Sequence, residues 1–209
     1  MEVYMSIDKI VVHNSGGLLN QPYASTQNLT AEDVDAAHRL KWGLQSTLGR
    51  WGGYTFFINK LGVLTQFRAI GEEQAAQKGH NLNTISICLA GNFSSGVDRP
   101  TFEQEIRLKN LIYQLLQKNF EGLVVLPGVE LNLELYRIIP HRVLNSTNCY
   151  GNSLKDDWAR NLIVGIYQEK IGILQKILNA YTMLLNILKY QKLGAVVPSS
   201  CMFEDNQDE

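Results

Sequence analysis

The chain has 209 residues, 45% of them hydrophobic, which is enough apolar material for one well-buried core. Charge is nearly balanced, with 19 Lys and Arg against 20 Asp and Glu, so no overall field attracts nucleic acid or an anionic membrane. The three cysteines lie far apart, which argues against a disulfide framework, and the N-terminus lacks the pattern of a secretory signal, so we expect synthesis in the cytoplasm.

The first predicted elements are a strand and a helix. Residues 10–15 (IVVHNS) form a β-branched run that ends in polar residues, which predicts a buried strand with His13 at its C-terminal edge. Residues 30–48 begin with Thr30 and two acidic residues, and apolar residues then follow at helical spacing. This pattern predicts a capped amphipathic helix, which Gly49 and the glycines after it are expected to end.

Further strands follow at four places. Residues 54–58 and 63–67 are separated by a turn of hairpin length, and residues 84–91 form another apolar run. A short strand at residues 137–140 leads into a polar loop. Because these strands are interleaved with helices, the sequence predicts the α/β class, with a central mixed β-sheet flanked by helices.

The second predicted helix covers residues 101–118. It opens with Thr101 as the N-cap and Gln104 three residues later, which is the pattern of a capping box, and its apolar residues lie largely on one side. One such side is what a helix needs to cover a sheet.

The end of the chain predicts a different organisation. From about residue 153 the sequence is helical with hardly a breaker, until Gly194 and Pro198 precede an acidic stretch. We therefore expect a main domain over residues 1–160, a long apolar C-terminal helix over residues 161–193, and a flexible acidic tail over residues 194–209.

Two histidines and one cysteine have the residue types and order of a zinc site. Catalytic zinc takes three protein ligands from histidine nitrogen and cysteine thiolate, and keeps a fourth position for water. His141 and Cys149 are eight residues apart across a polar loop that can turn both side chains toward one point, while His13 arrives from the first strand. On the residues alone this is suggestive, because most histidines and cysteines in proteins have structural roles. We interpret His38, His80 and Cys88 in that structural way.

Four successive segments resemble the signature segments of a family of zinc amidases that includes phage lysozymes of the amidase type and peptidoglycan recognition proteins. They are IVVHNSGG, GRWGGYTFFINKLGVLTQFR, KGHNLNTISICLAGNF and PHRVLNSTNCYG, and the resemblance spans roughly residues 8–160. It implies a central mixed β-sheet flanked by helices, N-acetylmuramoyl-L-alanine amidase activity and a Zn²⁺ cofactor.

The resemblance also implies roles for individual residues. His13 and His141 match the family's metal histidines, and Cys149 matches its cysteine ligand. Tyr54 matches the catalytic tyrosine, and Thr147 matches a position that faces the substrate carbonyl.

Arg68 ends the second strand of the hairpin, where relatives often have an arginine that lines the peptide groove. We therefore expect Arg68 to bind a carboxylate of the stem peptide. Val143 stands where an acidic residue often orients a ligand in relatives, so one partner of the metal site is expected to be missing. The other departures from the family pattern are Asn14, Thr55, Ala76 and Tyr150.

The implied substrate is peptidoglycan, and the implied activity is endolysin-like lysis or remodelling of the cell wall after release through a holin-type route. Two alternatives from other classes remain open. One is a peptidoglycan-binding module without activity, against which the presence of Cys149 argues. The other is a scaffold protein that works through its C-terminal helix.

The C-terminal helix carries apolar residues at alternating steps of three and four, which is the seam of a coiled coil. They are Val164, Tyr167, Ile171, Leu174, Leu178, Tyr181, Leu185 and Leu188. A second apolar stripe beside this seam widens the face, so we expect a homo-oligomer joined through residues 160–192. We expect no transmembrane segment, because charged and polar residues interrupt the run, and interfacial membrane contact is the alternative. The interrupting residues are Glu169, Lys170, Gln175, Lys176 and Lys189.

Overall fold

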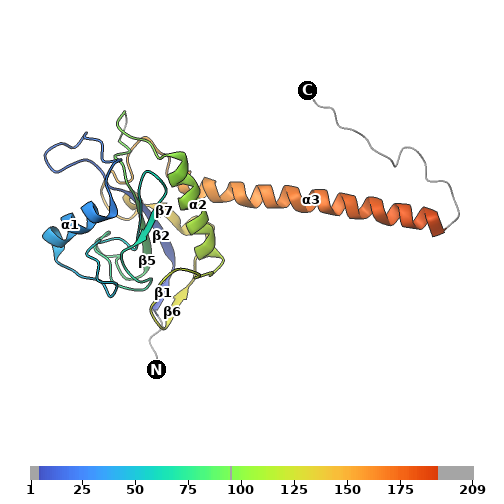
Figure 1. Cartoon of the computed structure of the whole chain (residues 1–209), viewed down its shortest axis with the longest axis horizontal. Coiled ribbons are helices and arrows are strands. Elements are labelled where there is room, and N and C mark those ends of the chain that lie inside the picture. Colours follow the sequence, from blue (N-terminus) through green and yellow to red (C-terminus); the bar gives the residue numbers. More distant parts are fainter. Residues whose placement is uncertain (1–4, 95, 193–209) are drawn as a thin grey trace. The chain divides into compact units, whose positions relative to one another are not determined.

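The computed structural model describes residues 5–94 and 96–192, and the chain divides into two compact units, Met1–Ile163 and Val164–Glu209. Each unit is described by itself. The elements of the chain are shown in Figure 1. Their bounds are β1 (Met5–Ile7), β2 (Lys9–Asn14), α1 (Ala31–Trp42), β3 (Phe56–Ile58), β4 (Leu64–Gln66), β5 (Thr84–Leu89), α2 (Phe102–Leu116), β6 (Val129–Leu131), β7 (Ile138–Pro140) and α3 (Trp158–Lys192), with 3₁₀ turns at Leu135–Arg137 and His141–Val143.

The first unit is built on a mixed sheet of five strands in the order β4-β3-β5-β2-β7. Strand β2 runs parallel to both of its neighbours, β5 and β7, and β3 runs parallel to β5. The hairpin partner β4 is antiparallel to β3 and lies at the edge. This arrangement confirms the predicted class, a mixed sheet with helices. A separate parallel pair of β1 and β6, three residues each, was not predicted.

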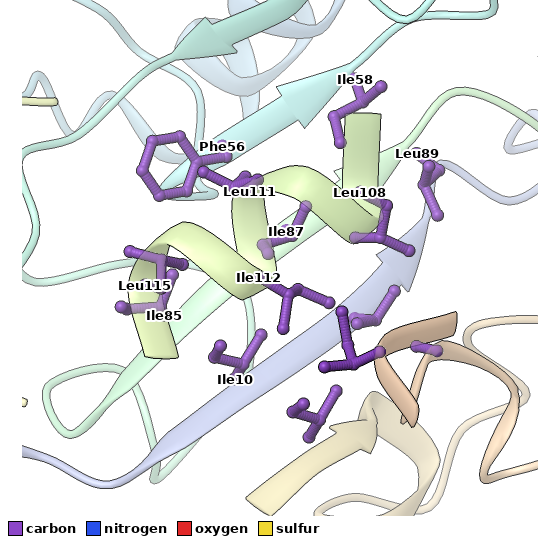
Figure 2. Packing of buried hydrophobic residues seen from close by; sticks show 14 of the residues in the cluster. Ile10, Phe56, Ile58, Ile85, Ile87, Leu89, Leu108, Leu111, Ile112 and Leu115 are labelled. Atoms are coloured by element: carbon purple, nitrogen blue, oxygen red, sulfur yellow. The ribbon is translucent and has the colours of Figure 1, made fainter. Parts of the chain in front are cut away.

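One face of the sheet packs against α2. Side chains alternate between the two faces along a strand, so Ile10, Ile85 and Ile87 point to the same side. Figure 2 shows these residues beneath the apolar side of α2, with Leu108 and Ile112 of the helix in contact with them. All five side chains are fully buried, and burying each stabilises the fold by about 1.5–3 kcal/mol.

The opposite face of the sheet packs against α1. Val34 of α1 joins a smaller buried cluster with Phe57, Phe67 and Cys88. His13 is the register partner of Cys88 across β2 and β5, and such partners point to the same face. The sheet therefore directs His13 to the α1 side, away from the main core.

The predicted helices formed, with one shorter than expected. Helix α2 begins after the N-cap Thr101, and the capping box with Gln104 is present. Helix α1 was expected to continue to residue 48 but ends at Trp42. The reason is Gly43, which adopts a left-handed conformation with φ 59° and donates its N–H to the carbonyl of Arg39, a C-terminal cap that glycine makes without steric cost.

Helix α3 confirms the predicted long C-terminal helix. It covers Trp158–Lys192, and Ala159 and Ile163 in its first turns belong to the buried core of the first unit. By length and composition alone, Trp158–Lys189 has a mean hydropathy of 1.3 and could cross a membrane, contrary to the expectation that its charged residues leave too short a run. The predicted acidic tail, residues 194–209, lies outside the described residues.

Candidate metal centre

The three predicted metal ligands meet at one edge of the sheet. His13 lies near the C-terminal end of β2, and His141 follows directly after β7. Because β2 and β7 are parallel neighbours, their ends meet, and the two imidazole rings lie with centroids 4.5 Å apart. Cys149 Sγ lies 3.6 Å from His13 Nδ1, and one ligand atom of each of the three residues lies within 4.8 Å of the others.

The loop between His141 and Cys149 is folded back on itself. The backbone N–H of Arg142 donates to the carbonyl of Cys149 at 2.9 Å, which closes the loop. The Arg142 guanidinium also donates to the carbonyls of Gly151 and Leu154. The backbone N–H of Asn14, next to the first ligand, points at Cys149 Sγ at 3.4 Å. The loop sequence thus places two ligands beside the third.

Two amide side chains orient the imidazole rings. His13 Nε2 lies 3.0 Å from Gln77 Oε1, and His141 Nε2 lies 3.0 Å from Asn145 Oδ1. Since an amide oxygen only accepts, each Nε2 is assigned as the N–H donor, which leaves Nδ1 of both rings with a lone pair for a metal. Gln77 is itself held, because its amide N–H donates to the hydroxyl of Thr84.

Sequence reasoning missed both orienting residues. Asn145 is four residues after His141, so an amide two residues beyond Val143 orients the ring in place of the missing acidic residue. That spacing was a signal within the loop. Gln77 is 64 residues from His13 in sequence, and no local pattern connects the two.

Burial sets the protonation states of the ligands. It lowers the pKa of His13 to about 3, with the nearby His141 lowering it further and the hydrogen bond to Gln77 opposing the shift. Burial also lowers the pKa of His141 and raises the pKa of Cys149 to about 12. Both imidazoles are therefore neutral at neutral pH, as metal binding requires, and the thiol would release a proton when a metal binds.

Two imidazole nitrogens and one sulfur, converging with room for a fourth group, match the donor set that zinc takes in catalytic sites. The ligands line a cavity of about 460 Å³. Tyr54 and Thr147, the predicted catalytic residues, line the same cavity. A second hollow, of about 550 Å³, is lined by residues of the loop from Arg142 to Asn148 and by Asp156, and it contains none of the three ligands. The cavity of about 460 Å³ is therefore the candidate active site.

Tyr54 lies beside the metal ligands and is held by α1. Its ring centroid is 5.2 Å from that of His13. Burial raises the pKa of Tyr54 well above its usual value, and the thiols of Cys88 and Cys149 raise it further, so the hydroxyl stays protonated. His38 of α1 supports the adjoining backbone, because its Nδ1 accepts the N–H of Gly53 at 2.8 Å. The structural interpretation of His38 therefore stands.

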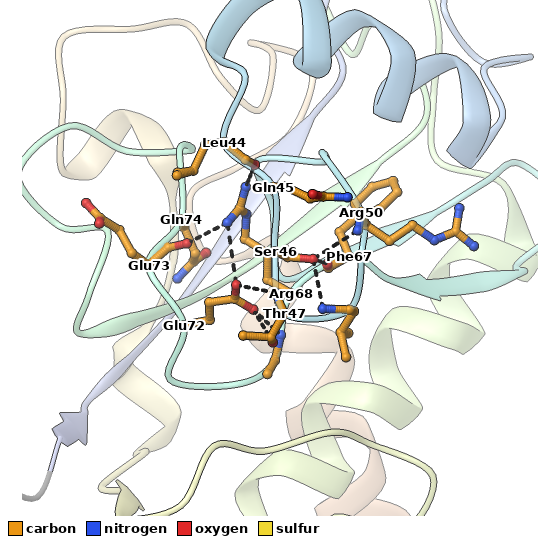
Figure 3. A network of polar contacts seen from close by, with 12 residues as sticks. Leu44, Gln45, Ser46, Thr47, Arg50, Phe67, Arg68, Glu72, Glu73 and Gln74 are labelled. Carbon is orange, nitrogen blue, oxygen red and sulfur yellow. Dashed lines mark hydrogen bonds and ion pairs between the residues drawn. The ribbon is translucent and has the colours of Figure 1, made fainter.

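Arg68 is not at the rim of the cavity, and its predicted contact with substrate is wrong. Its side chain is 1% exposed. Figure 3 shows the guanidinium enclosed by a polar network, in which it donates to the carbonyl of Glu73 at 2.9 Å and to that of Leu44 at 2.5 Å. Its Nε donates to the carbonyl of Gly52 at 2.8 Å. Arg68 therefore organises the segment that precedes Tyr54, and its buried guanidinium does not line the cavity where a substrate carboxylate would bind.

The two adjacent glycines of the GRWGGY motif lie where no side chain fits. A Cβ at Gly52 would lie 2.3 Å from the ring of Phe67, and one at Gly53 would lie 2.8 Å from Trp42. Both approaches are too close for any other residue. The backbone at Gly52 can therefore pack directly against Phe67, the neighbour of Arg68 in sequence, and its carbonyl accepts a hydrogen bond from Arg68 Nε.

The departures from the family pattern have separate explanations. Thr55 is buried and exchanges hydrogen bonds with Ser86 on β5, a structural role. Ala76 and Asn14 line the cavity without adding a metal ligand. Tyr150 is fully buried and packs edge-on against Trp158.

A mixed sheet covered by helices, with a His-His-Cys group at the carboxyl ends of two parallel strands, defines an α/β protein with a candidate metal centre. Residues 3–152 match the model of the N-acetylmuramoyl-L-alanine amidase family, Amidase_2. The chain belongs to this family. A search of curated proteins found no match.

Solved structures of related fold agree with this assignment. The amidase LysC from Clostridium intestinale is 22% identical, with a TM-score of 0.50 over 71% of this chain and 78% of that one. The Ph2119 endolysin from a Thermus scotoductus bacteriophage is 17% identical, with a TM-score of 0.52 over 76% and 85%. Bumblebee PGRP-SA is 20% identical, with a TM-score of 0.51 over 71% and 77%. At these identities the likeness concerns the fold.

Proposed function

We propose that this protein is a zinc-dependent N-acetylmuramoyl-L-alanine amidase, which hydrolyses the amide bond between N-acetylmuramic acid and L-alanine in peptidoglycan. The observation that carries the proposal is the convergence of His13, His141 and Cys149 in an open cavity. Membership in the amidase family supports the reaction class. The LysC and Ph2119 names describe an amidase and an endolysin, which supports the cell wall as the place of action.

The metal ligands have a defined task in this proposal. Nδ1 of His13, Nδ1 of His141 and the thiolate of Cys149 would hold the ion and leave a fourth position open. When bound, Zn²⁺ supplies Lewis-acid chemistry, since it polarises a carbonyl and makes water nucleophilic at neutral pH. Gln77 and Asn145 keep the rings in the tautomer that presents Nδ1.

Tyr54 and Thr147 would act on the substrate oxygen. Attack on the amide carbon places negative charge on the carbonyl oxygen, which then requires hydrogen-bond donors. The raised pKa of Tyr54 keeps its hydroxyl protonated, so it serves as a donor rather than a base. The Thr147 hydroxyl accepts the N–H of Cys149 at 3.3 Å, which leaves its own hydrogen for the substrate. One such donor is typically worth about 3 kcal/mol of barrier.

Lys41 replaces Arg68 as the proposed ligand of a stem-peptide carboxylate. It is exposed and lines the cavity together with Trp42 and Tyr23. Its ammonium lies 4.6 Å from the centre of the Trp42 ring, a cation–π contact that holds the charge at the cavity rim. Aromatic rims of this kind can also pack against the apolar faces of a sugar or peptide.

Digestion of purified sacculi tests the proposal, with muropeptides identified by mass spectrometry. We expect freed stem peptides that carry a new N-terminal alanine, loss of this release after chelation, and its return with Zn²⁺. Retention on sacculi without release would show a binding module, and neither retention nor release would indicate a scaffold protein. Either of these two results would overturn the proposed amidase activity.

Two further parts of the proposal concern the cell. Release to the wall through a holin-type route is proposed by analogy with the endolysin among the related structures. Self-association through residues 160–192 is proposed from the exposed apolar surface of α3, on which Ile171, Leu174 and Leu178 are each more than half exposed.

A further inference from the structure

Helix α3 has an apolar surface that extends far around its circumference. Both the predicted seam and the neighbouring stripe are exposed, as in Leu178, which is 56% exposed, and Ile177, which is 60% exposed. No residue of its most apolar window is buried among the described residues. A two-stranded coiled coil in water would cover only the seam and leave the neighbouring apolar stripe exposed to water.

Within residues 171–188 of α3, the neutral polar residues lie on one narrow stripe, and charge is almost absent. Between Glu169–Lys170 and Lys189, the 18 residues 171–188 contain a single charge, Lys176. The neutral polar and small residues recur at steps of three and four, which places them on one side of the helix. They are Gly172, Gln175, Asn179, Thr182 and Asn186. A water-facing side of a soluble helix normally carries charges of both signs, which this stripe lacks.

Three of the polar side chains in this stripe make hydrogen bonds within the helix. Gln175 Nε2 donates to Asn179 Oδ1 at 2.9 Å, and the Thr182 hydroxyl donates to the backbone carbonyl of Leu178 at 2.9 Å. In hydrocarbon every polar group requires a partner, because water is absent. These intrahelical bonds lower the cost of placing the stripe in an apolar medium.

The length and the flanking charges also fit a bilayer. Eighteen helical residues span about 27 Å, close to the roughly 30 Å hydrocarbon core of a membrane. Glu169 and Lys170 at one end and Lys189 at the other would lie at the headgroups. Lys176 lies beside Gln175 and next to the polar stripe, so its ammonium can share the side on which neighbouring helices meet.

We propose that residues 171–188 of α3 insert across a lipid bilayer, with copies associating through the stripe of Gly172, Gln175, Asn179, Thr182 and Asn186. The apolar seam then faces lipid, and the small and amide-bearing stripe faces the partner helix, as is usual for helix pairs in membranes. This inference is independent of the amidase activity, because none of the metal-centre residues belongs to α3.

Flotation of the full-length chain with vesicles of phosphatidylcholine alone tests the proposal. Neutral lipid removes electrostatic attraction, so flotation reports apolar insertion. Trypsin is then added, and the cleaved bonds are identified by mass spectrometry. We expect the chain to float, with the bond after Lys176 protected until detergent is added.

Paired variants provide the control. Replacing Ile177→Lys and Leu184→Lys, seven residues apart on the lipid-facing side, should lower the floated fraction more than tenfold. Replacing Asn179→Gln and Asn186→Gln, with the same spacing on the polar stripe, should leave flotation unchanged. Circular dichroism of both pairs checks that the helix still forms.

Two results would overturn the proposal. A full-length chain that stays in solution as a defined oligomer would mean that a second copy, and not lipid, covers the apolar face. Flotation with Lys176 cleaved without detergent would mean that the helix lies on the surface of the membrane and does not cross it.

Discussion

The candidate metal centre depends on side chains other than its three ligands. Asn145 and Gln77 each occupy the outer nitrogen of a ligand histidine, so the inner nitrogen is the one left for a metal. Partners of this kind typically change metal affinity by 10–100-fold when removed. The site is therefore larger than the three residues that a ligand motif contains.

Asn145→Ala should weaken Zn²⁺ retention by about 10–100-fold, because His141 would lose the acceptor that fixes its ring. Competition with a metal-binding dye measures this affinity. Val143→Ala is the matched control, since Val143 lies in the same loop, is 54% exposed and contacts no ligand nitrogen in any described hydrogen bond. Equal affinities of the two variants would remove the orienting role from Asn145.

Cys149→Ala and Tyr54→Phe should have different phenotypes. The first removes a ligand, so both bound zinc and hydrolysis of sacculi should be lost. The second keeps the ligands and removes one donor to the developing oxyanion, so zinc should remain while kcat falls by a factor on the order of a hundred. Elemental analysis and initial rates measure the two quantities. Full activity of Tyr54→Phe would show that the hydroxyl has no part in catalysis.

Lys41→Ala and Arg68→Lys should have different effects, because Lys41 is proposed to bind substrate and Arg68 has a structural role. Lys41 is exposed at the cavity rim, so its loss should raise KM for peptide-bearing fragments and leave the free energy of unfolding nearly unchanged. Arg68→Lys cannot supply three carbonyls with donors in the same geometry and should destabilise the fold by about 1–3 kcal/mol. Urea unfolding and steady-state kinetics measure both quantities for each variant. A raised KM with unchanged stability for Arg68→Lys would return the carboxylate-binding role to Arg68.

The metal ligands could be predicted from the sequence, but the position of the Arg68 side chain could not. His13, His141 and Cys149 were predicted through a family resemblance, and the structure brings their ligand atoms together. Arg68 was misassigned because a position at the end of a strand does not reveal where a long side chain goes. The Arg68 side chain is buried because tertiary packing brings three backbone carbonyls, including that of Gly52, within reach of its guanidinium.

At the scale of elements, sequence patterns predicted which helices and strands form more accurately than where they begin and end. Short β-branched and apolar runs predicted the central strands, and a capping box predicted the start of α2, since these signals are local. The end of α1 was missed because Leu44 and Leu48 continue the helical spacing past Gly43, whose left-handed conformation decides the matter. The pair of β1 and β6 was missed because three-residue strands carry too little periodicity.

The junction between α1 and the Tyr54 segment should be sensitive to acid. Burial lowers the pKa of His38 to about 4, so between about pH 6.5 and pH 4 the unfolded chain binds the proton and the folded chain does not. Stability is therefore full above about pH 6.5 and falls as the pH drops through this window, by up to about 3 kcal/mol. His38→Asn keeps an acceptor for Gly53 but does not titrate.

Urea unfolding of the wild type and His38→Asn at about pH 7 and about pH 4.5 measures this contribution. The wild type should lose more free energy of unfolding over that interval than the variant. Equal losses would mean that His38 does not contribute to the acid sensitivity.

At the scale of the whole molecule, all candidate catalytic residues belong to the unit that ends at Ile163. A chain truncated after Ile163 should therefore keep zinc binding and hydrolysis while losing self-association. Truncation at residue 160 is a poorer choice, because it removes the fully buried Ile163 from the core. Light scattering in detergent measures the association, and a full-length monomer unchanged by truncation would refute the proposed oligomer.

The position of Cys149 has an evolutionary consequence. His13, His141 and Cys149 are not members of the main buried cluster, and Cys149 only packs against its edge. A single codon change at this position would remove the chemistry and leave the sheet, the helices and the cavity in place. Under the proposed function, a lineage built on this chain is thus one mutational step from exchanging turnover for recognition, without having to evolve a new fold.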